Sequence, residues 1–127
     1  MIMGKGARRE REAVNLYKQA GWAVYRPSVV RFGENDVFGL FDLIAVDKGR
    51  KPRFVQVKSN RAAGIEHWCH EVNALMPSEW TVSEFVVCHD REGWRLLQPV
   101  GEGYQTVYDG RDSDGDMGEG LAEWLSP

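Results

Sequence analysis

The stretch FDLIAVDKGRKPRFVQVKSN, residues 41–60, constrains the fold more than any other part of the chain. Residues 40–46 and 53–58 are short runs rich in β-branched and apolar residues, which favours strands. The segment DKGRKP between them has the Gly, Pro and polar residues of a hairpin turn. A hairpin centred near Gly49 and Arg50 pairs residues whose numbers sum to about 99, so Asp42 is predicted to lie across from residues 56–58.

Polar side chains occupy these strands at positions where packing alone would favour Val or Ile. Gln56 and Lys58 are two residues apart and therefore point to the same face of the sheet. Neighbouring antiparallel strands lie roughly 5 Å apart, so Asp42, Gln56 and Lys58 can converge on one small volume. The spacing predicts a candidate site on this hairpin.

The remaining elements predict an α/β fold with a mixed central sheet flanked by helices. We expect helices over residues 5–20 and 62–76, and further strands over 22–27, 81–89 and 93–99. Residues 28–39 are predicted to form a mobile loop. We expect a single folded domain over residues 1–100, followed by an acidic, Gly- and Asp-rich tail over 101–127 in which residues 109–120 are disordered and LAEWL docks as a last helical turn.

Glu10 lies on the first predicted helix, close to the centre of its apolar stripe at 100° per residue. A carboxylate on the face that packs against a sheet is costly unless a group of opposite charge pairs with it. A divalent cation held jointly with Asp42 would satisfy Glu10, and a simple ion pair with Lys58 would also do so.

This set of groups matches the needs of phosphodiester cleavage. That reaction requires a cation on the phosphate, an activated water and positive charge for the developing oxyanion. Mg²⁺ prefers oxygen ligands, which Asp42, the Gln56 side chain and the Val57 carbonyl would supply, with Glu10 binding directly or through water. Lys58 would orient or deprotonate the water, or stabilise the transition state.

Helix-borne Glu10 followed by FDLIAV and FVQVKS resembles the core of the PD-(D/E)xK nucleases. Within that superfamily, KGARRERE, GWAVYR, FDLIAV and VQVK resemble the archaeal-type Holliday junction resolvases over residues 5–60, and residues 61–99 match by element order only. The resemblance implies a homodimeric, Mg²⁺-dependent endonuclease, with Mn²⁺ able to substitute, that binds four-way DNA junctions and places paired nicks. It implies Glu10, Asp42, Gln56 and Lys58 as the active-site residues.

The chain departs from the family pattern in two places. Phe41 stands where the family has proline, which is a mild variation. Gln56 stands where most members carry Glu, which keeps an oxygen ligand but removes a negative charge. The missing carboxylate could come from Glu34 or Asp36 in the loop, or from Glu66 or Glu71 on the second helix.

The charge distribution indicates a basic surface for a polyanion. Residues 1–63 carry thirteen Lys and Arg against six Asp and Glu, whereas residues 64–127 carry three against thirteen. No base-reading motif is evident, so recognition by DNA shape is expected. The predicted DNA contacts are Lys5, Arg8, Arg9, Arg11, Arg26, Arg31, Lys51, Arg53, Ser59 and Arg61.

Two other functions stay open. One is a nuclease of the same fold that cuts flaps, ends or duplex sites, and the other is a non-catalytic DNA-junction-binding protein, which Gln56 keeps in consideration. No run of about 18 apolar residues predicts a membrane span, and a cytoplasmic location is expected, in a host cell if the chain is viral. Three further patterns were interpreted as non-functional: a polar helix face at His67, His70 and Glu71, buried thiols at Cys69 and Cys88, and a solvated acidic stretch at Asp112, Asp114 and Asp116.

Overall fold

The structure is a computed structural model that describes residues 5–27, 36–111 and 118–127. The elements in chain order are α1 (Lys5–Gln19), β1 (Ala23–Tyr25), β2 (Leu43–Val46), β3 (Arg53–Ser59), α2 (Ile65–Leu75), β4 (Val82–His89), β5 (Gly93–Val100), β6 (Gly103–Asp109) and α3 (Glu119–Leu125). The predicted helices and strands up to residue 99 are confirmed, with ends that differ by a few residues. Of the predicted loop over residues 28–39, residues 28–35 lie outside the described part of the chain.

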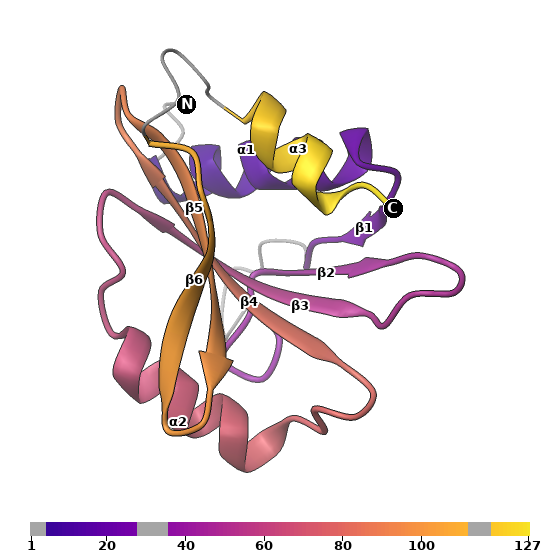
Figure 1. Ribbon diagram of the computed structural model, residues 1–127, viewed down its shortest axis with the longest axis vertical. Helices are drawn as coiled ribbons and strands as arrows, with labels where there is room; N and C mark the ends of the chain where they lie inside the picture. Colours follow the sequence, from indigo (N-terminus) through magenta and orange to yellow (C-terminus); the bar gives the residue numbers. More distant parts are fainter. Residues whose placement is uncertain (1–4, 28–35, 112–117) are drawn as a thin grey trace.

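The strands form one six-stranded mixed sheet in the order β1-β2-β3-β4-β5-β6. β3 and β4 run parallel, and the other four neighbouring pairs are antiparallel. Parallel neighbours need a crossover connection, which α2 supplies between β3 and β4. α1 and α3 cover one face of the sheet and α2 covers the other (Figure 1). The predicted α/β fold with a mixed, helix-flanked sheet is confirmed.

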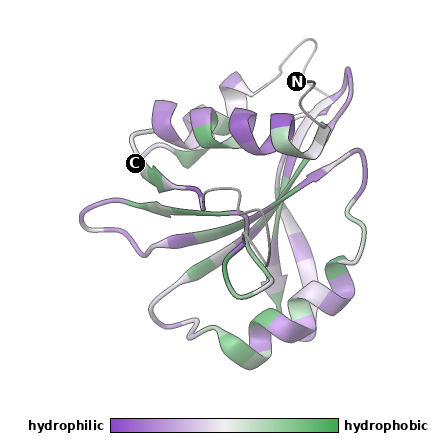
Figure 2. Ribbon diagram, turned by 180° about the vertical axis from the view of Figure 1, so that it is seen from behind, coloured by the Kyte–Doolittle hydropathy of each residue, from purple (hydrophilic) through white to green (hydrophobic). Residues whose placement is uncertain are grey.

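Each face of the sheet has its own hydrophobic core. On the α1 and α3 face, Leu43, Val55 and Trp94 are fully buried, and on the α2 face Phe41 and Phe85 are fully buried. Fully burying one such side chain contributes roughly 1.5–3 kcal/mol. Hydrophilic and hydrophobic residues alternate along α1 and α2 (Figure 2), as expected for helices that pack one side on a sheet.

The buried stripe of α1 differs in phase from the predicted one. Ala13, Leu16, Tyr17 and Ala20 are buried, and the residue that continues this stripe toward the N-terminus is Arg9. Glu10 is half-buried at the edge of the stripe rather than at its centre. The prediction placed too much weight on Ala7 and Val14, which are only partly buried because they flank the contact with the sheet.

The sequence predicted an acidic tail from residue 101 onward, but the structure has a further strand in this region. β6 pairs with β5 from Val100↔Gly103 to Arg95↔Asp109, so it extends the sheet. Most of its side chains are exposed, because it is an edge strand held by backbone pairing, and such a strand lacks the apolar alternation that reveals strands in a sequence. Within the expected disordered stretch, residues 112–117 lie outside the described residues.

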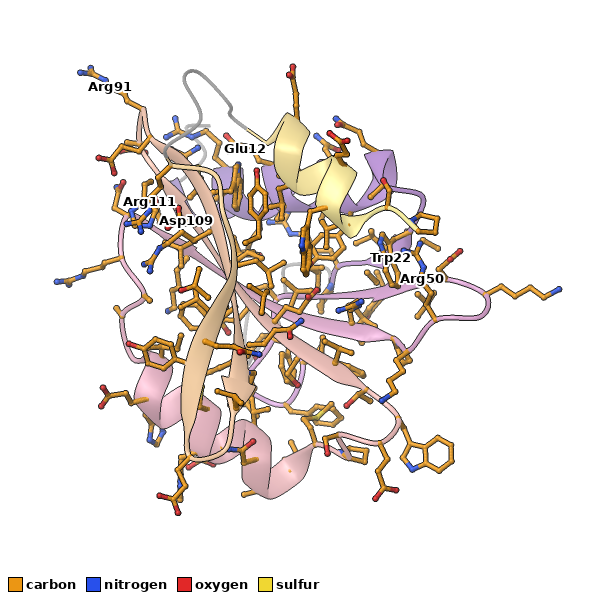
Figure 3. All side chains as sticks on the ribbon, viewed as in Figure 1. Glu12, Trp22, Arg50, Arg91, Asp109 and Arg111 are labelled. Atoms are coloured by element: carbon orange, nitrogen blue, oxygen red, sulfur yellow. The ribbon has the colours of Figure 1, made fainter. Side chains whose placement is uncertain are left out.

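α3 confirms that the segment LAEWL docks as a helix. Leu121 and Leu125 are buried against the core that α1 covers. The indole Nε1 of Trp22 and Nη1 of Arg50 both donate to the carbonyl oxygen of Leu125, at 3.1 and 2.9 Å. The Arg50 guanidinium also stacks on the Trp22 ring at 3.8 Å from its centroid, and both side chains lie at the end of α3 (Figure 3). In the part of the chain that the structure describes, no helix is long and apolar enough to cross a membrane.

Candidate active site

Asp42 lies immediately before β2 and is held by the backbone of β3. Leu43 pairs with Val55, so Asp42 is the next residue along and lies across from Gln56, as predicted. The backbone N–H of Asp42 donates to the Val55 carbonyl at 2.7 Å. Its carboxylate oxygen Oδ2 accepts a hydrogen bond from the backbone N–H of Val57 at 2.8 Å. These two bonds fix the carboxyl group beside the polar part of β3.

Gln56 and Lys58 line one cleft with a volume of about 320 Å³. Both side chains are half-buried. Val57, which lies between them, and Val55, which precedes Gln56, are buried on the opposite face of the strand. The alternation therefore places the polar side chains on the α2 side of the sheet, together with Asp42. The rest of the cleft is lined by Asp36, Gly39, Leu40, Ala63, Gly64, His67, Trp68 and Phe85.

A tight turn over residues 36–41 forms one wall of this cleft. Val37 and Phe41 exchange backbone hydrogen bonds at 2.8 and 3.1 Å. The Asp36 carboxylate accepts from the Gly39 N–H at 3.1 Å. On the opposite side, the indole Nε1 of Trp68 on α2 donates to the Leu40 carbonyl at 2.8 Å, so α2 holds the turn in place.

The surroundings of Asp42 hold its pKa well above the ordinary value for a carboxyl group. Burial is the largest cause and raises the pKa to about 6. The hydrogen bond from Val57 and the charge of Lys58 lower it, whereas the charges of Glu10 and Asp36 raise it. The charges of two further carboxyl groups thus oppose the ionisation of Asp42, and the charge of Lys58 favours it.

Glu10 comes to this site from α1, and its carboxylate lies 3.4 Å from Nε of Arg26, at the end of β1. Both side chains are about one-quarter exposed, at 26% and 29%. Arg26 was predicted as a DNA contact, and it instead faces Glu10. The pairing leaves Glu10 close enough to Asp42 to raise the pKa of that residue.

The oxygen atoms at this site suit a hard divalent cation better than a soft one. The Val57 N–H points to Asp42, and in a strand the carbonyl of the same residue points to the same side. Asp42, the Gln56 amide and the Val57 carbonyl thus offer oxygens to one region, with Glu10 and Asp36 nearby. Among the described residues, no three His, Cys, Asp or Glu side chains are grouped as a metal site.

Two predicted DNA contacts are turned toward the protein itself. The Arg9 residue is only 7% exposed, and its guanidinium pairs with Glu12 at 2.7 Å and with Asp90. Arg53 donates to the fully buried Glu84 at 3.1 Å. Both arginines are held by carboxylates within the fold, so neither is suited to a phosphate.

The other predicted contacts have different settings. Ser59 has a buried hydroxyl for which the described residues supply no hydrogen-bond partner. Lys51 lies at the opposite end of the hairpin from Lys58, and its Nζ donates to the Ser78 carbonyl at 3.4 Å. Lys5 begins α1, but its side chain, like all of Arg31, lies outside the described residues. Three further predicted contacts are exposed, namely Arg8 and Arg11 on α1 and Arg61 after β3.

Two groups of residues were not predicted from the sequence. Asn60, with a left-handed backbone at φ 67°, both donates to the Asp90 carboxylate at 3.1 Å and accepts from the Asp90 N–H at 2.7 Å. Asp90 in turn binds Arg9, so this contact ties α1 to the ends of β3 and β4. Glu84 belongs to the second group, and an acidic residue within the apolar run EFVVCH was a signal that could have identified it.

Of the three further patterns noted in the sequence, the structure describes the two thiols and the polar face of α2. Cys69 and Cys88 are buried thiols. His67, His70 and Glu71 are exposed on α2, and His67 lies 3.8 Å from Glu71. His67 also lines the mouth of the cleft, which the sequence did not indicate. The acidic stretch at 112–116 falls outside the described residues.

Comparison with known proteins places this geometry in a recognised fold. No family model matches the sequence, and no curated protein matches it significantly. The structure is similar to that of Hjc from Archaeoglobus fulgidus, a Holliday junction resolvase from an archaeal hyperthermophile. The TM-score is 0.55 at 17% sequence identity, and the match covers 95% of this chain and 100% of the other. The chain therefore has the restriction-endonuclease-like α/β fold of that resolvase, as its resemblance to the archaeal-type Holliday junction resolvases predicted.

Proposed function

We propose that the protein is a metal-dependent endonuclease that resolves four-way DNA junctions by paired nicks. The observation that carries this proposal is the arrangement of three polar residues on the hairpin. Asp42 lies across from Gln56 in the observed register, and Gln56 and Lys58 line one cleft because side chains alternate along β3. The solved structure with a similar fold is itself a Holliday junction resolvase. The fold alone allows many activities, so the arrangement of these side chains is the stronger argument.

The site residues fit a Mg²⁺ ion, for which Mn²⁺ would substitute. Asp42, the Gln56 side-chain oxygen and the Val57 carbonyl would hold it, and Glu10 would bind directly or through water. The charges of Glu10 and Asp36 raise the pKa of Asp42, although burial is the larger cause, and a bound cation would offset those negative charges. A bound ion would supply positive charge to the phosphate and lower the pKa of a water molecule.

The protein's own side chains have separate roles in this mechanism. Lys58 lies in the same cleft and would orient the attacking water or stabilise charge on the phosphate in the transition state. The Val57 N–H holds the Asp42 carboxylate in a fixed orientation. Arg26 contacts Glu10 and would keep its carboxylate at the edge of the site. Asp36, on the wall of the cleft, is suited to replace the carboxylate that Gln56 lacks.

DNA would bind across the exposed cations around this cleft, which include Arg8, Arg11 and Arg61, with Lys5 and Arg31 as further candidates. Lys51 could contact a more distant part of a branched substrate. We further propose that the protein acts as a homodimer in the cytoplasm. A four-way junction has two-fold symmetry, so a two-fold dimer would present two active sites to two opposed strands.

A second function is favoured by one specific observation. Gln56 takes the place of a carboxylate, and the described residues contain no group of three classical ligands. These facts support a protein that binds junctions without cutting them. A nuclease of the same fold that acts on flaps, ends or duplex sites would use the same residues but would cut linear and branched DNA equally.

Cleavage assays on labelled DNA separate these functions. A synthetic four-way junction, a flap and a linear duplex would be incubated with Mg²⁺, Mn²⁺ or EDTA. The proposal predicts paired nicks on the junction alone, absent with EDTA and absent in Asp42→Asn. Glu123→Gln is the matched control, since it removes a charge from an exposed position on α3. Binding without cleavage under every metal would leave a junction-binding protein, and equal cutting of all three substrates would indicate a general nuclease.

A further inference from the structure

Phe38 combines two features that are each unfavourable for a folded chain in water. Phe38 is 64% exposed, although its side chain is a large apolar ring. Its backbone has φ 59°, in the left-handed region that is a genuine outlier for a bulky residue. Gly39 and Asn60 also adopt positive φ, but glycine and asparagine tolerate that region. Packing within the protein does not explain why an aromatic residue occupies this position.

The turn around Phe38 is held firmly enough to maintain this conformation. Val37 and Phe41 pair on either side of it, the Asp36 carboxylate accepts from Gly39, and Trp68 donates to Leu40. Phe41 is also fully buried in the core beside α2. Each of these contacts involves a neighbour of Phe38, so the fold fixes the backbone and leaves the ring in solvent. Strain maintained in this way is typical of functional sites.

The position of the turn connects Phe38 with the candidate active site. Asp36, Gly39 and Leu40 line the same cleft as Gln56 and Lys58. Residues that precede and follow Phe38 in the sequence therefore line the cleft, so the turn that carries the ring borders it. The turn lies on the α2 side of the sheet, below β2 and β3 (Figure 1).

We propose that Phe38 stacks on an unstacked nucleobase at the branch point of the DNA and so makes the site selective for branched substrates. This inference rests on the proposed nuclease function. Every base offers an aromatic face, so one exposed ring can bind any sequence, and such stacking contributes about 1–3 kcal/mol per base. A continuous duplex has its bases stacked and offers no free face, whereas a branch point does. A nucleobase is favoured over a protein partner because the turn that carries the ring lines the same cleft as Lys58, and that cleft is suited to a phosphate.

The test compares substitutions that remove the ring with one that keeps it. Asn tolerates the left-handed backbone, so Phe38→Asn removes the ring without adding strain, while Phe38→Trp retains an aromatic face. Trp80→Ala is the matched control, because Trp80 is 70% exposed but lies beside β4 at the end that pairs with Arg53, away from Lys58. Affinities for a four-way junction and a linear duplex would be measured in EDTA, with 2-aminopurine at the branch point as a fluorescent reporter of stacking.

The proposal predicts that Phe38→Asn weakens junction binding about tenfold or more, with little change for the duplex, and abolishes the quenching of 2-aminopurine. Phe38→Trp and Trp80→Ala should behave like the wild type, and Phe38→Asn should unfold at the same or a higher temperature. An unchanged ratio of junction to duplex affinity in Phe38→Asn would overturn the proposal. A change in oligomeric state with unchanged 2-aminopurine fluorescence would also overturn it and would identify Phe38 as a protein contact. If the wild type binds and cuts junctions and Phe38→Asn does so equally well, only the role of Phe38 is refuted. If the wild type neither binds nor cuts DNA, the proposed nuclease function is refuted as well.

Discussion

Glu84 and Asp42 are two desolvated carboxyl groups on opposite faces of the same sheet, and they differ in how their charge is matched. Glu84 on β4 is fully buried and accepts hydrogen bonds from Tyr17 at 2.6 Å, Arg53 at 3.1 Å and Gln98 at 3.0 Å. These donors come from α1, β3 and β5, so the carboxylate joins three elements of the fold. A buried charge with a cation and further donors around it is part of the structure.

The negative charge of Asp42 is less well compensated by surrounding groups than that of Glu84, although Asp42 is also less buried. It accepts one backbone hydrogen bond from Val57 and is influenced by Lys58, but Glu10 and Asp36 oppose its ionisation. Burial is the largest cause of the raised pKa at both Asp42 and Glu84. Burial and a perturbed pKa therefore do not by themselves distinguish a functional carboxylate from a structural one. The charge of the surrounding groups does, because the excess of carboxylates around Asp42 would be relieved by a cation.

The largest expected effect is on stability, through Glu84. Glu84→Ala would leave the partly buried Arg53 guanidinium and the buried Tyr17 hydroxyl without their partner, at a cost of about 3–5 kcal/mol in the free energy of unfolding. Urea denaturation would measure it. The exposed Glu123→Ala should change stability by less than about 0.5 kcal/mol. A Glu84→Ala protein that unfolds at the wild-type urea concentration would show that this group does not stabilise the fold.

Asp42→Asn is expected to act on cleavage instead of stability. The substitution keeps an oxygen that can accept from the Val57 N–H but removes the charge of the proposed metal ligand. Junction cleavage should fall by more than about a hundredfold, the loss that even an indirect change at a metal site can cause. Initial rates under excess Mg²⁺ would measure this, with the circular dichroism spectrum as a check on folding. Full activity in Asp42→Asn would mean that Asp42 and Glu84 do not differ in role.

Gln56→Glu sharpens the comparison by adding the carboxylate that the site lacks. Affinity for a hard cation increases with the charge of its ligands, so the Mn²⁺ concentration for half-maximal cleavage should fall about tenfold. Gln105→Glu is the matched control, because Gln105 is exposed on β6 at the far edge of the sheet. A higher Mn²⁺ requirement in Gln56→Glu would indicate that the native amide has a role that a carboxylate cannot fill.

The smallest expected effect is the pH dependence of stability. Folding raises the pKa of Asp42 from an ordinary value near 3.8 to about 6, so the folded protein keeps a proton that the unfolded chain has already lost. The contribution that the protonated Asp42 makes to stability is therefore fully present below about pH 4, declines as the pH rises and is lost above about pH 6. Asp42→Asn lacks this decline, and its stability relative to wild type should increase between about pH 4.5 and 7.5 in urea titrations. A relative stability that stays constant or decreases over that range would contradict the raised pKa.

Local patterns were sufficient to predict the hairpin and the convergence of its polar residues. The β-branched runs and the turn around Gly49 determined the pairing of β2 and β3, and Asp42 was correctly placed across from Gln56. The period of two along β3 placed Gln56 and Lys58 on one face. These predictions succeeded because they depend on short stretches of chain whose geometry is regular.

Features that depend on partners from distant elements were not predictable in the same way. Arg9 resembles a surface cation in the sequence, and only its contact with Asp90, 81 residues away, makes it part of the interior. β6 lacks an apolar face because it joins the sheet as an edge, so its composition resembles that of a loop. The exposed ring of Phe38 next to the cleft depends on how α2 holds the turn through Trp68.

Mn²⁺ binding followed by electron paramagnetic resonance is the most direct test of the contrast between the two carboxylates. The wild type, Glu84→Gln and Asp42→Asn would be titrated at neutral pH, and free Mn²⁺ would be measured from its signal. We predict that the wild type and folded Glu84→Gln bind the ion and that Asp42→Asn does not. Absence of binding by the wild type, or equal binding by Asp42→Asn, would contradict the assignment of the Asp42 cleft as a cation-dependent active site.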